Sequence, residues 1–101
     1  MQPFTKEVIR IIQNIPSGKV MTYGQVARLA GNPRGARQVA RILHSLSKKY
    51  QLPWHRVINA RGEIVISDHE LFTEQKRNLE LEGVEVSPEG KVNLHIYQVQ
   101  N

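Results

Sequence analysis

The residues best suited to chemistry stand together in the segment Pro53-Trp54-His55-Arg56, which contains the only tryptophan of the chain. Proline fixes its own φ and restricts the residue before it, so a rigid loop is predicted here, and Val57-Ile58 then begins a strand. No catalytic triad is indicated, because no nucleophile stands nearby with a base. A lone tryptophan usually anchors a core, but an indole placed beside His-Arg can also stack on a nucleobase. We therefore expect this segment to face a nucleic acid.

The charge is divided unevenly along the 101 residues, which carry a net charge of +5. No acidic residue occurs between Glu7 and Glu63, whereas acidic residues predominate from Glu63 onward. The basic residues of the acid-free interval are Arg10, Lys19, Arg28, Arg34, Arg37, Arg41, Lys48, Lys49, Arg56 and Arg61. A solvated surface normally mixes both signs, so this interval predicts binding to a polyanion.

Several kinds of protein are excluded by what the sequence lacks. There is no cysteine, so there are no disulfides, thiolate metal sites or cysteine nucleophiles. The four histidines do not have metal-ligand spacing, and we expect neither a metal nor a cofactor. No apolar run approaches the roughly 18 residues of a membrane span, and the N-terminus does not read as a signal peptide. A cytoplasmic protein follows, nucleoid-associated in a bacterium or nuclear in a eukaryote, with no membrane association.

Hydrophobic periodicity and helix caps predict a mostly α fold with a small β-hairpin, a winged helix-turn-helix-like single domain over residues 1–101. The predicted helices run from Thr5 to about Asn14, Tyr23 to Ala30, Arg34 to about Ser47 and Glu70 to about Glu82. Val57-Ile58 and Glu63–Ile66 would form the hairpin, or wing, and residues 84–86 and 92–99 would be extended. The second and third helices, joined by a short link, are typical of a helix-turn-helix.

The third predicted helix has the composition of a DNA-facing helix. Small residues at Gly35, Ala36 and Ala40 alternate with arginines at positions 34, 37 and 41. Small side chains allow a close approach to the DNA backbone, and arginines contact phosphates or enter a groove, which favours the narrow minor groove. The alternative is a helix whose basic face is merely solvated.

Five motifs, in order along the chain, give a specific resemblance. They are Ile15-Pro16-Ser17-Gly18-Lys19-Val20, Thr22-Tyr23-Gly24, Ala36-Arg37-Gln38-Val39, Pro53-Trp54-His55-Arg56-Val57-Ile58 and Glu82-Gly83. With these motifs the sequence resembles the DNA-binding domain of the O6-alkylguanine-DNA alkyltransferases. In active transferases the fourth motif reads Pro-Cys-His-Arg, and the cysteine accepts the alkyl group. Trp54 occupies that position here, as in the alkyltransferase-like proteins, which bind O6-alkylguanine in duplex DNA without repairing it.

The resemblance implies a role for each matched residue. Arg37 would be the finger that replaces a flipped-out nucleotide, and Tyr23 would rotate the phosphate of the target. The lesion pocket would consist of Tyr23, Leu43, Trp54, Val57 and Ser67. The DNA-binding residues would be Tyr23, Arg34, Gly35, Ala36, Arg37, Gln38 and Arg41. His55 and Glu82 match the pair that activates the cysteine of transferases and would here be structural. Ser67-Asp68 departs from the family, since transferases often carry Tyr-Ser there and some relatives an arginine.

The expected function is that of a non-enzymatic damage sensor. The protein, expected to be a monomer, would bind O6-alkylguanine in duplex DNA, flip the base into the pocket and flag the site for nucleotide excision repair proteins. One alternative is a winged helix-turn-helix transcription factor that reads undamaged DNA. Another is a residual enzyme, which the absence of a placed nucleophile or paired carboxylates argues against.

Overall fold

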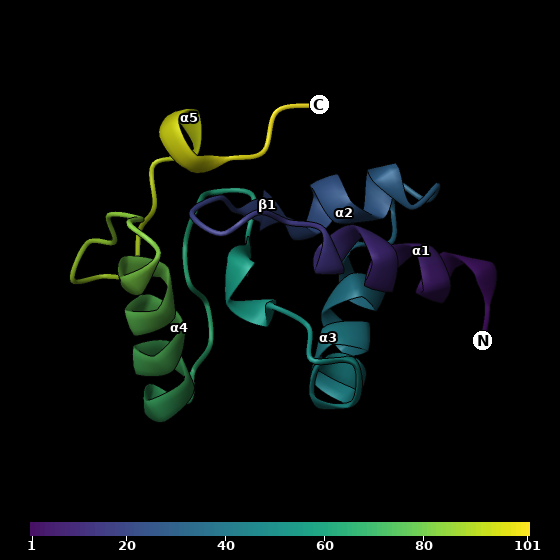
Figure 1. The fold of residues 1–101 in the computed structure, drawn as a ribbon, viewed down its shortest axis with the longest axis horizontal. Coiled ribbons are helices and arrows are strands. Elements are labelled where there is room, and N and C mark those ends of the chain that lie inside the picture. The colour runs from purple at the N-terminus through teal and green to yellow at the C-terminus, as the bar shows by residue number, and fades with distance from the viewer.

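The computed structural model describes residues 1–101 and is mostly helical, with one two-stranded sheet (Figure 1). In chain order the elements are α1 (Pro3–Gln13), β1 (Met21–Thr22), α2 (Tyr23–Leu29), α3 (Ala36–Tyr50), the 3-10 helix η1 (Trp54–Arg56), β2 (Val57–Ile58), α4 (His69–Leu81) and α5 (Leu94–Tyr97). The prediction of a mostly α fold is confirmed. None of these helices has the length and apolar character needed to cross a membrane.

Local sequence signals account for where the helices begin. Pro3 occupies the first turn of α1, where its missing N–H is not needed, so this helix starts before the predicted Thr5. Thr22 and Gln25 form a capping box at α2, in which each side chain binds the backbone N–H of the other. Asp68 caps α4 by accepting a hydrogen bond from the backbone of Leu71.

The sheet lies between two apolar clusters that make up the core. The larger cluster is built from α1, α2 and α3 and includes Met21 and Val57. The smaller one joins Val20 and Ile58 to residues of α4 and the C-terminal segment. Neighbouring residues of a strand point to opposite sides, so the two short strands contribute to both clusters. The sheet thereby connects the helix-turn-helix with the C-terminal half.

The predicted hairpin is wrong in its pairing. Val57-Ile58 pairs in parallel with Met21-Thr22 instead of with residues 63–66. Residues 64–66 form no strand, and Glu63 makes only an isolated bridge with Lys91. The physical reason is burial: Val57 and Ile58 are almost inaccessible to solvent, and only a partner within the core satisfies their backbone groups.

The C-terminal segment also differs from the prediction. Residues 94–97 form the short helix α5, capped by the side chain of Asn93, instead of the middle of an extended edge strand. Only an isolated bridge between Gln98 and Val20 keeps extended pairing there. The local alternation of Leu94 and Ile96 indicated a strand, but the asparagine cap favours a helical turn.

Candidate nucleic-acid interface

A cavity of about 320 Å³ opens beside α3 and contains three of the residues predicted to form the lesion pocket. Tyr23 reaches it from the start of α2, Leu43 from α3 and Trp54 from η1. Trp54 is half-buried and packs against the larger core cluster with part of its ring. The 3-10 turn that follows Pro53 thus holds the indole at the cavity wall, as the rigid loop predicted from the sequence would do.

Five further residues line the cavity and were not predicted to do so. They are Ala40, His44 and Ser47 on α3, Ile66 in the segment before α4, and Leu71 on α4. The α3 residues share the face of Leu43 at spacings of three and four, so the helical period could have identified them. Ile66 and Leu71 come from a distant part of the chain, and no local signal links them to Trp54.

Two residues assigned to the pocket from the sequence do not line this cavity. Val57 has no exposed surface and belongs to the larger core cluster, because it is the first residue of β2 and pairs with Met21. Ser67 is exposed to solvent, whereas its neighbour Ile66 lines the cavity. The segment therefore contributes to the cavity through Ile66 and not through Ser67.

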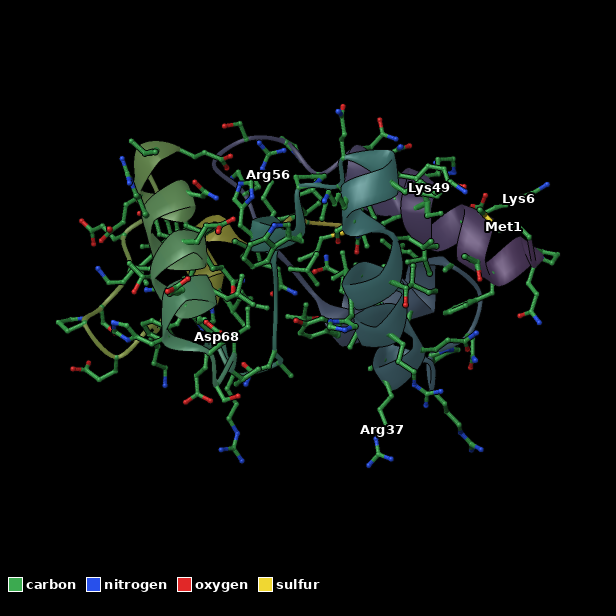
Figure 2. All side chains as sticks on the ribbon, turned by 90° about the horizontal axis from the view of Figure 1, so that it is seen from below. Met1, Lys6, Arg37, Lys49, Arg56 and Asp68 are labelled. Atoms are coloured by element: carbon green, nitrogen blue, oxygen red, sulfur yellow. The ribbon has the colours of Figure 1, made fainter.

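The arginines of the helix-turn-helix are available to a ligand. Arg34, Arg37 and Arg41 are exposed, and in Figure 2 Arg37 projects from one end of α3 away from the protein body. Ala36 and Gln38 are partly exposed beside it. These side chains lie at or near the N-terminal end of α3, which suits contact with a phosphate backbone and a groove.

Gly35, another predicted DNA contact, is buried at the cap of α3. A Cβ atom there would lie 2.8 Å from the ring of Phe4, so glycine is required for α1 to pack against the turn. The positive charge of the acid-free interval is also more dispersed than the sequence suggested. Lys49 lies on the side opposite to Arg37 (Figure 2).

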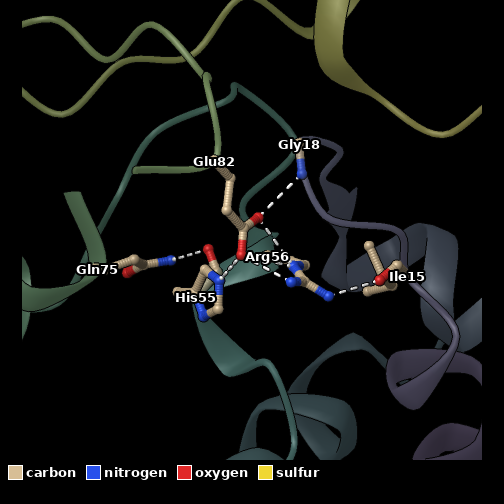
Figure 3. Close-up of polar contacts among 6 residues, drawn as sticks. All are labelled: Ile15, Gly18, His55, Arg56, Gln75 and Glu82. Atoms are coloured by element: carbon tan, nitrogen blue, oxygen red, sulfur yellow. Dashed lines mark hydrogen bonds and ion pairs between the residues drawn. The ribbon is translucent and has the colours of Figure 1, made fainter. Parts of the chain in front are cut away.

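Directly after Trp54, the side chains of His55 and Arg56 bind Glu82, which follows α4 (Figure 3). The Nη2 atom of Arg56 lies 2.7 Å from one carboxylate oxygen, and its Nε lies 3.0 Å from the other. His55 Nε2 lies 2.8 Å from the same carboxylate, and because a carboxylate only accepts, it is the donor. The predicted pair of His55 and Glu82 is therefore part of a larger cluster that includes Arg56.

Backbone groups complete this polar cluster. The N–H of Gly18 donates to Glu82 at 3.0 Å, and Arg56 donates to the carbonyl of Ile15 at 2.8 Å. Gln75 of α4, which is buried, donates to the carbonyl of His55 at 3.2 Å (Figure 3). These bonds connect the turn after α1 with η1 and α4, so they fix the backbone that carries Trp54.

The two sides of η1 also differ in their protonation chemistry. Burial alone would raise the pKa of Glu82, but hydrogen bonds from Arg56, Gly18 and His55 outweigh it and lower the pKa from 4.5 to about 2. On the cavity side, burial raises the pKa of Tyr23, which keeps its phenol neutral. The cluster thus holds a permanent carboxylate, whereas the cavity offers a neutral hydroxyl.

The chain matches the family model of the 6-O-methylguanine DNA methyltransferase, DNA-binding domain, over residues 3–84. It belongs to this family, and the resemblance found in the sequence is confirmed. Among its relatives, the DNA base-flipping protein of Vibrio parahaemolyticus is 44% identical over 100 residues, which cover 99% of each protein. Alkyltransferase-like protein 1 of Schizosaccharomyces pombe is 43% identical over 102 residues, covering 96% of this chain and 94% of that protein.

A solved structure agrees with both sequence comparisons. The crystal structure of S. pombe Atl1 in complex with damaged DNA containing O6-carboxymethylguanine matches with a TM-score of 0.90 and 42% identity. The match covers 100% of this chain and 98% of that one. The fold is therefore that of an alkyltransferase-like protein, and the chain has no cysteine at all.

Proposed function

We propose that this protein is a non-enzymatic sensor of O6-alkylguanine in duplex DNA. It binds from the minor groove with α2 and α3, flips the damaged base into the cavity beside Trp54 and leaves the alkyl group in place. The observation that carries the proposal is that Trp54, at the position of the acceptor cysteine, lines a mostly apolar cavity together with residues of α3, a helix with exposed arginines. Its volume of about 320 Å³ falls at the lower end of the range of roughly 300–1,000 Å³ for ligand sites.

Flipping is most favourable at a damaged base. Extruding a nucleotide costs roughly a few kcal/mol of unstacking and unpairing, and less where pairing is already impaired. An O6-alkyl group disrupts pairing with cytosine and so lowers this cost. Arg37 then occupies the vacated position in the stack and hydrogen-bonds the orphaned base, while Tyr23 turns the phosphate of the target nucleotide.

The chemistry of alkyl transfer has no acceptor here. An indole is not a nucleophile of the kind that accepts an alkyl group, and the nearby hydroxyl of Ser47 already donates to the carbonyl of Leu43. The His55 side chain, which would activate a cysteine, binds Glu82, and the same carboxylate also accepts from Arg56 and Gly18. The bound lesion therefore persists and marks the site for nucleotide excision repair proteins, a last step proposed from the family alone.

Two measurements on one DNA substrate test the proposal. A duplex with one O6-methylguanine and a fluorescent base analogue beside it should brighten when the protein is added, because flipping unstacks the analogue. The same duplex with guanine should stay dark. After prolonged incubation, mass spectrometry should find the protein mass unchanged. Equal fluorescence from both duplexes would contradict flipping, and a methyl adduct on the protein would contradict the non-enzymatic role.

A further inference from the structure

None of the side chains that line the cavity beside Trp54 carries a permanent positive charge. No lysine or arginine lines it, and its hydrogen-bonding side chains are Tyr23, His44 and Ser47. The Ser47 hydroxyl donates to the carbonyl of Leu43, and the Tyr23 phenol is kept neutral by burial. His44 is exposed, so water screens its imidazole. The rest of the lining is apolar.

Two arginines, one close to Trp54 in sequence and one on α3, do not line the cavity. Arg56 follows Trp54 by two residues, but its guanidinium is bound to Glu82 and to the carbonyl of Ile15. Arg37 projects away from the protein body (Figure 2). A negative charge placed in the cavity would therefore find no lysine or arginine there with which to form an ion pair.

The segment that forms one wall of the cavity also carries a negative charge. Ile66 and Leu71 both line the cavity, and Asp68 lies between them in the chain. The Asp68 carboxylate accepts a hydrogen bond from the backbone of Leu71 at 3.1 Å and takes part in no ion pair. It is exposed on the same side of the molecule as Arg37 (Figure 2). The segment that supplies two apolar side chains to the wall thus also carries an exposed anion without an ion-pair partner.

We propose that this wall makes the cavity selective by charge: it accepts uncharged O6-alkyl groups and discriminates against anionic ones such as carboxymethyl. Ile66 and Leu71 provide the apolar contact, and Asp68 repels a second carboxylate. The inference rests on the proposed function and names its preferred lesions. It also separates this chain from S. pombe Atl1, whose crystal structure contains O6-carboxymethylguanine.

Two physical effects act in the same direction. A carboxylate that leaves water for an apolar site without a cation loses hydration that nothing replaces. Asp68, in addition, repels it, and salt weakens this repulsion because the screening length is about 10 Å in 0.1 M salt. An alkyl group of the same shape loses no such hydration and gains apolar contact with Leu71.

The test compares duplexes that differ in one guanine: unmodified, O6-methyl, O6-isobutyl and O6-carboxymethyl. Isobutyl has the branched shape of carboxymethyl without its charge, so the affinity ratio of these two isolates the charge. We expect isobutyl to bind at least tenfold more tightly than carboxymethyl, with S. pombe Atl1 as the reference that accepts carboxymethyl. Equal binding of isobutyl and carboxymethyl, both above guanine, would overturn the inference alone. Equal binding of all four duplexes would overturn the proposed function as well.

Variants on α4 locate the effect. Leu71→Lys puts a cation on the cavity wall and should raise carboxymethyl affinity, relative to isobutyl, at least fivefold. Leu81→Lys is the matched control, since Leu81 is exposed on the same helix and does not line the cavity. It should leave the ratio unchanged.

Asp68→Asn retains a capping side chain and should raise carboxymethyl affinity, relative to isobutyl affinity, about threefold. If the ratio of carboxymethyl to isobutyl affinity is the same in Asp68→Asn as in the native protein, the proposed repulsion by Asp68 is overturned. If Leu71→Lys and Leu81→Lys change the ratio of carboxymethyl to isobutyl affinity equally, the proposal that this wall discriminates by charge is overturned.

Discussion

Neighbouring residues of η1 face two different environments, an open cavity on one side and a polar cluster on the other. On one side Trp54 borders a cavity in which the lining groups leave room for a ligand. On the other side His55 and Arg56 direct their side chains to Glu82, with exposed fractions of only 14% and 17%. No buried side-chain nitrogen or oxygen in the protein lacks a hydrogen-bond partner.

The difference separates polar groups that are already paired within the protein from a cavity that remains open. The polar cluster around Glu82 needs no ligand, because its hydrogen bonds are complete within the protein. On the cavity side, the indole and the apolar side chains line an open space. We infer that the cluster holds the turn in place and that the cavity recognises the lesion.

The largest expected effect is on stability, from Glu82→Gln. It removes the anion that faces the partly buried Arg56, and breaking such a pair should lower the free energy of unfolding by about 3 kcal/mol. Urea denaturation measures this. Glu7→Gln is the control, because Glu7 pairs with Arg10 on the exposed surface of α1. If both variants lose the same small amount, the cluster does not hold the turn.

The same carboxylate should make stability depend on pH. Its pKa is about 2 in the folded protein against a usual value of 4.5, so its contribution is complete above 4.5 and is lost as the pH falls toward 2. Between pH 6 and pH 3 the native protein should lose about 2 kcal/mol more than Glu82→Gln does. Denaturation curves of both proteins at the two pH values check this, and parallel losses would contradict it.

On the cavity side, Trp54→Ala should weaken lesion binding by about 2 kcal/mol, the size of a base–aromatic stacking interaction. Trp54→Phe keeps an aromatic face and should retain most of the affinity. Fluorescence anisotropy with an O6-methylguanine duplex, below the unfolding temperature of each variant, measures the change. Unchanged lesion affinity in Trp54→Ala would mean that the indole only fills the position of the cysteine.

Arg37→Ala should weaken binding to the lesion duplex about tenfold, close to 1.4 kcal/mol, because it removes the side chain that fills the gap in the stack. Arg61→Ala is the matched control, an equally exposed arginine outside α3, and should have a smaller effect. Titrations at one salt concentration compare the two. Similar losses would reduce Arg37 to a general phosphate contact.

Local signals in the sequence were sufficient for the helices and for part of the site. Thr22 and Gly31 delimit α2 as expected, with Gly31 in the left-handed conformation at φ +99. Tyr23, Leu43 and Trp54 line one cavity, and their role in holding a lesion stays a prediction. These features depend on caps and on motifs, which are readable along the chain.

Features that depend on distant partners could not be predicted. Val57 appeared to begin a wing, but the strand that pairs with it lies more than thirty residues earlier, at Met21. Arg56 counted toward the DNA-facing charge, although its anion is Glu82. Leu71 lines the cavity although α4 is distant from Trp54 in sequence, and only the packing of α4 beside η1 brings it there.

The most direct test of the central claim is the affinity of the native protein for two duplexes that differ only in one O6-methylguanine. Sequence-independent phosphate contacts are the same in both duplexes, so at equal salt the ratio reports recognition of the lesion. We predict that the damaged duplex binds well over tenfold more tightly. Equal affinities would contradict the sensor and favour a protein that binds undamaged DNA.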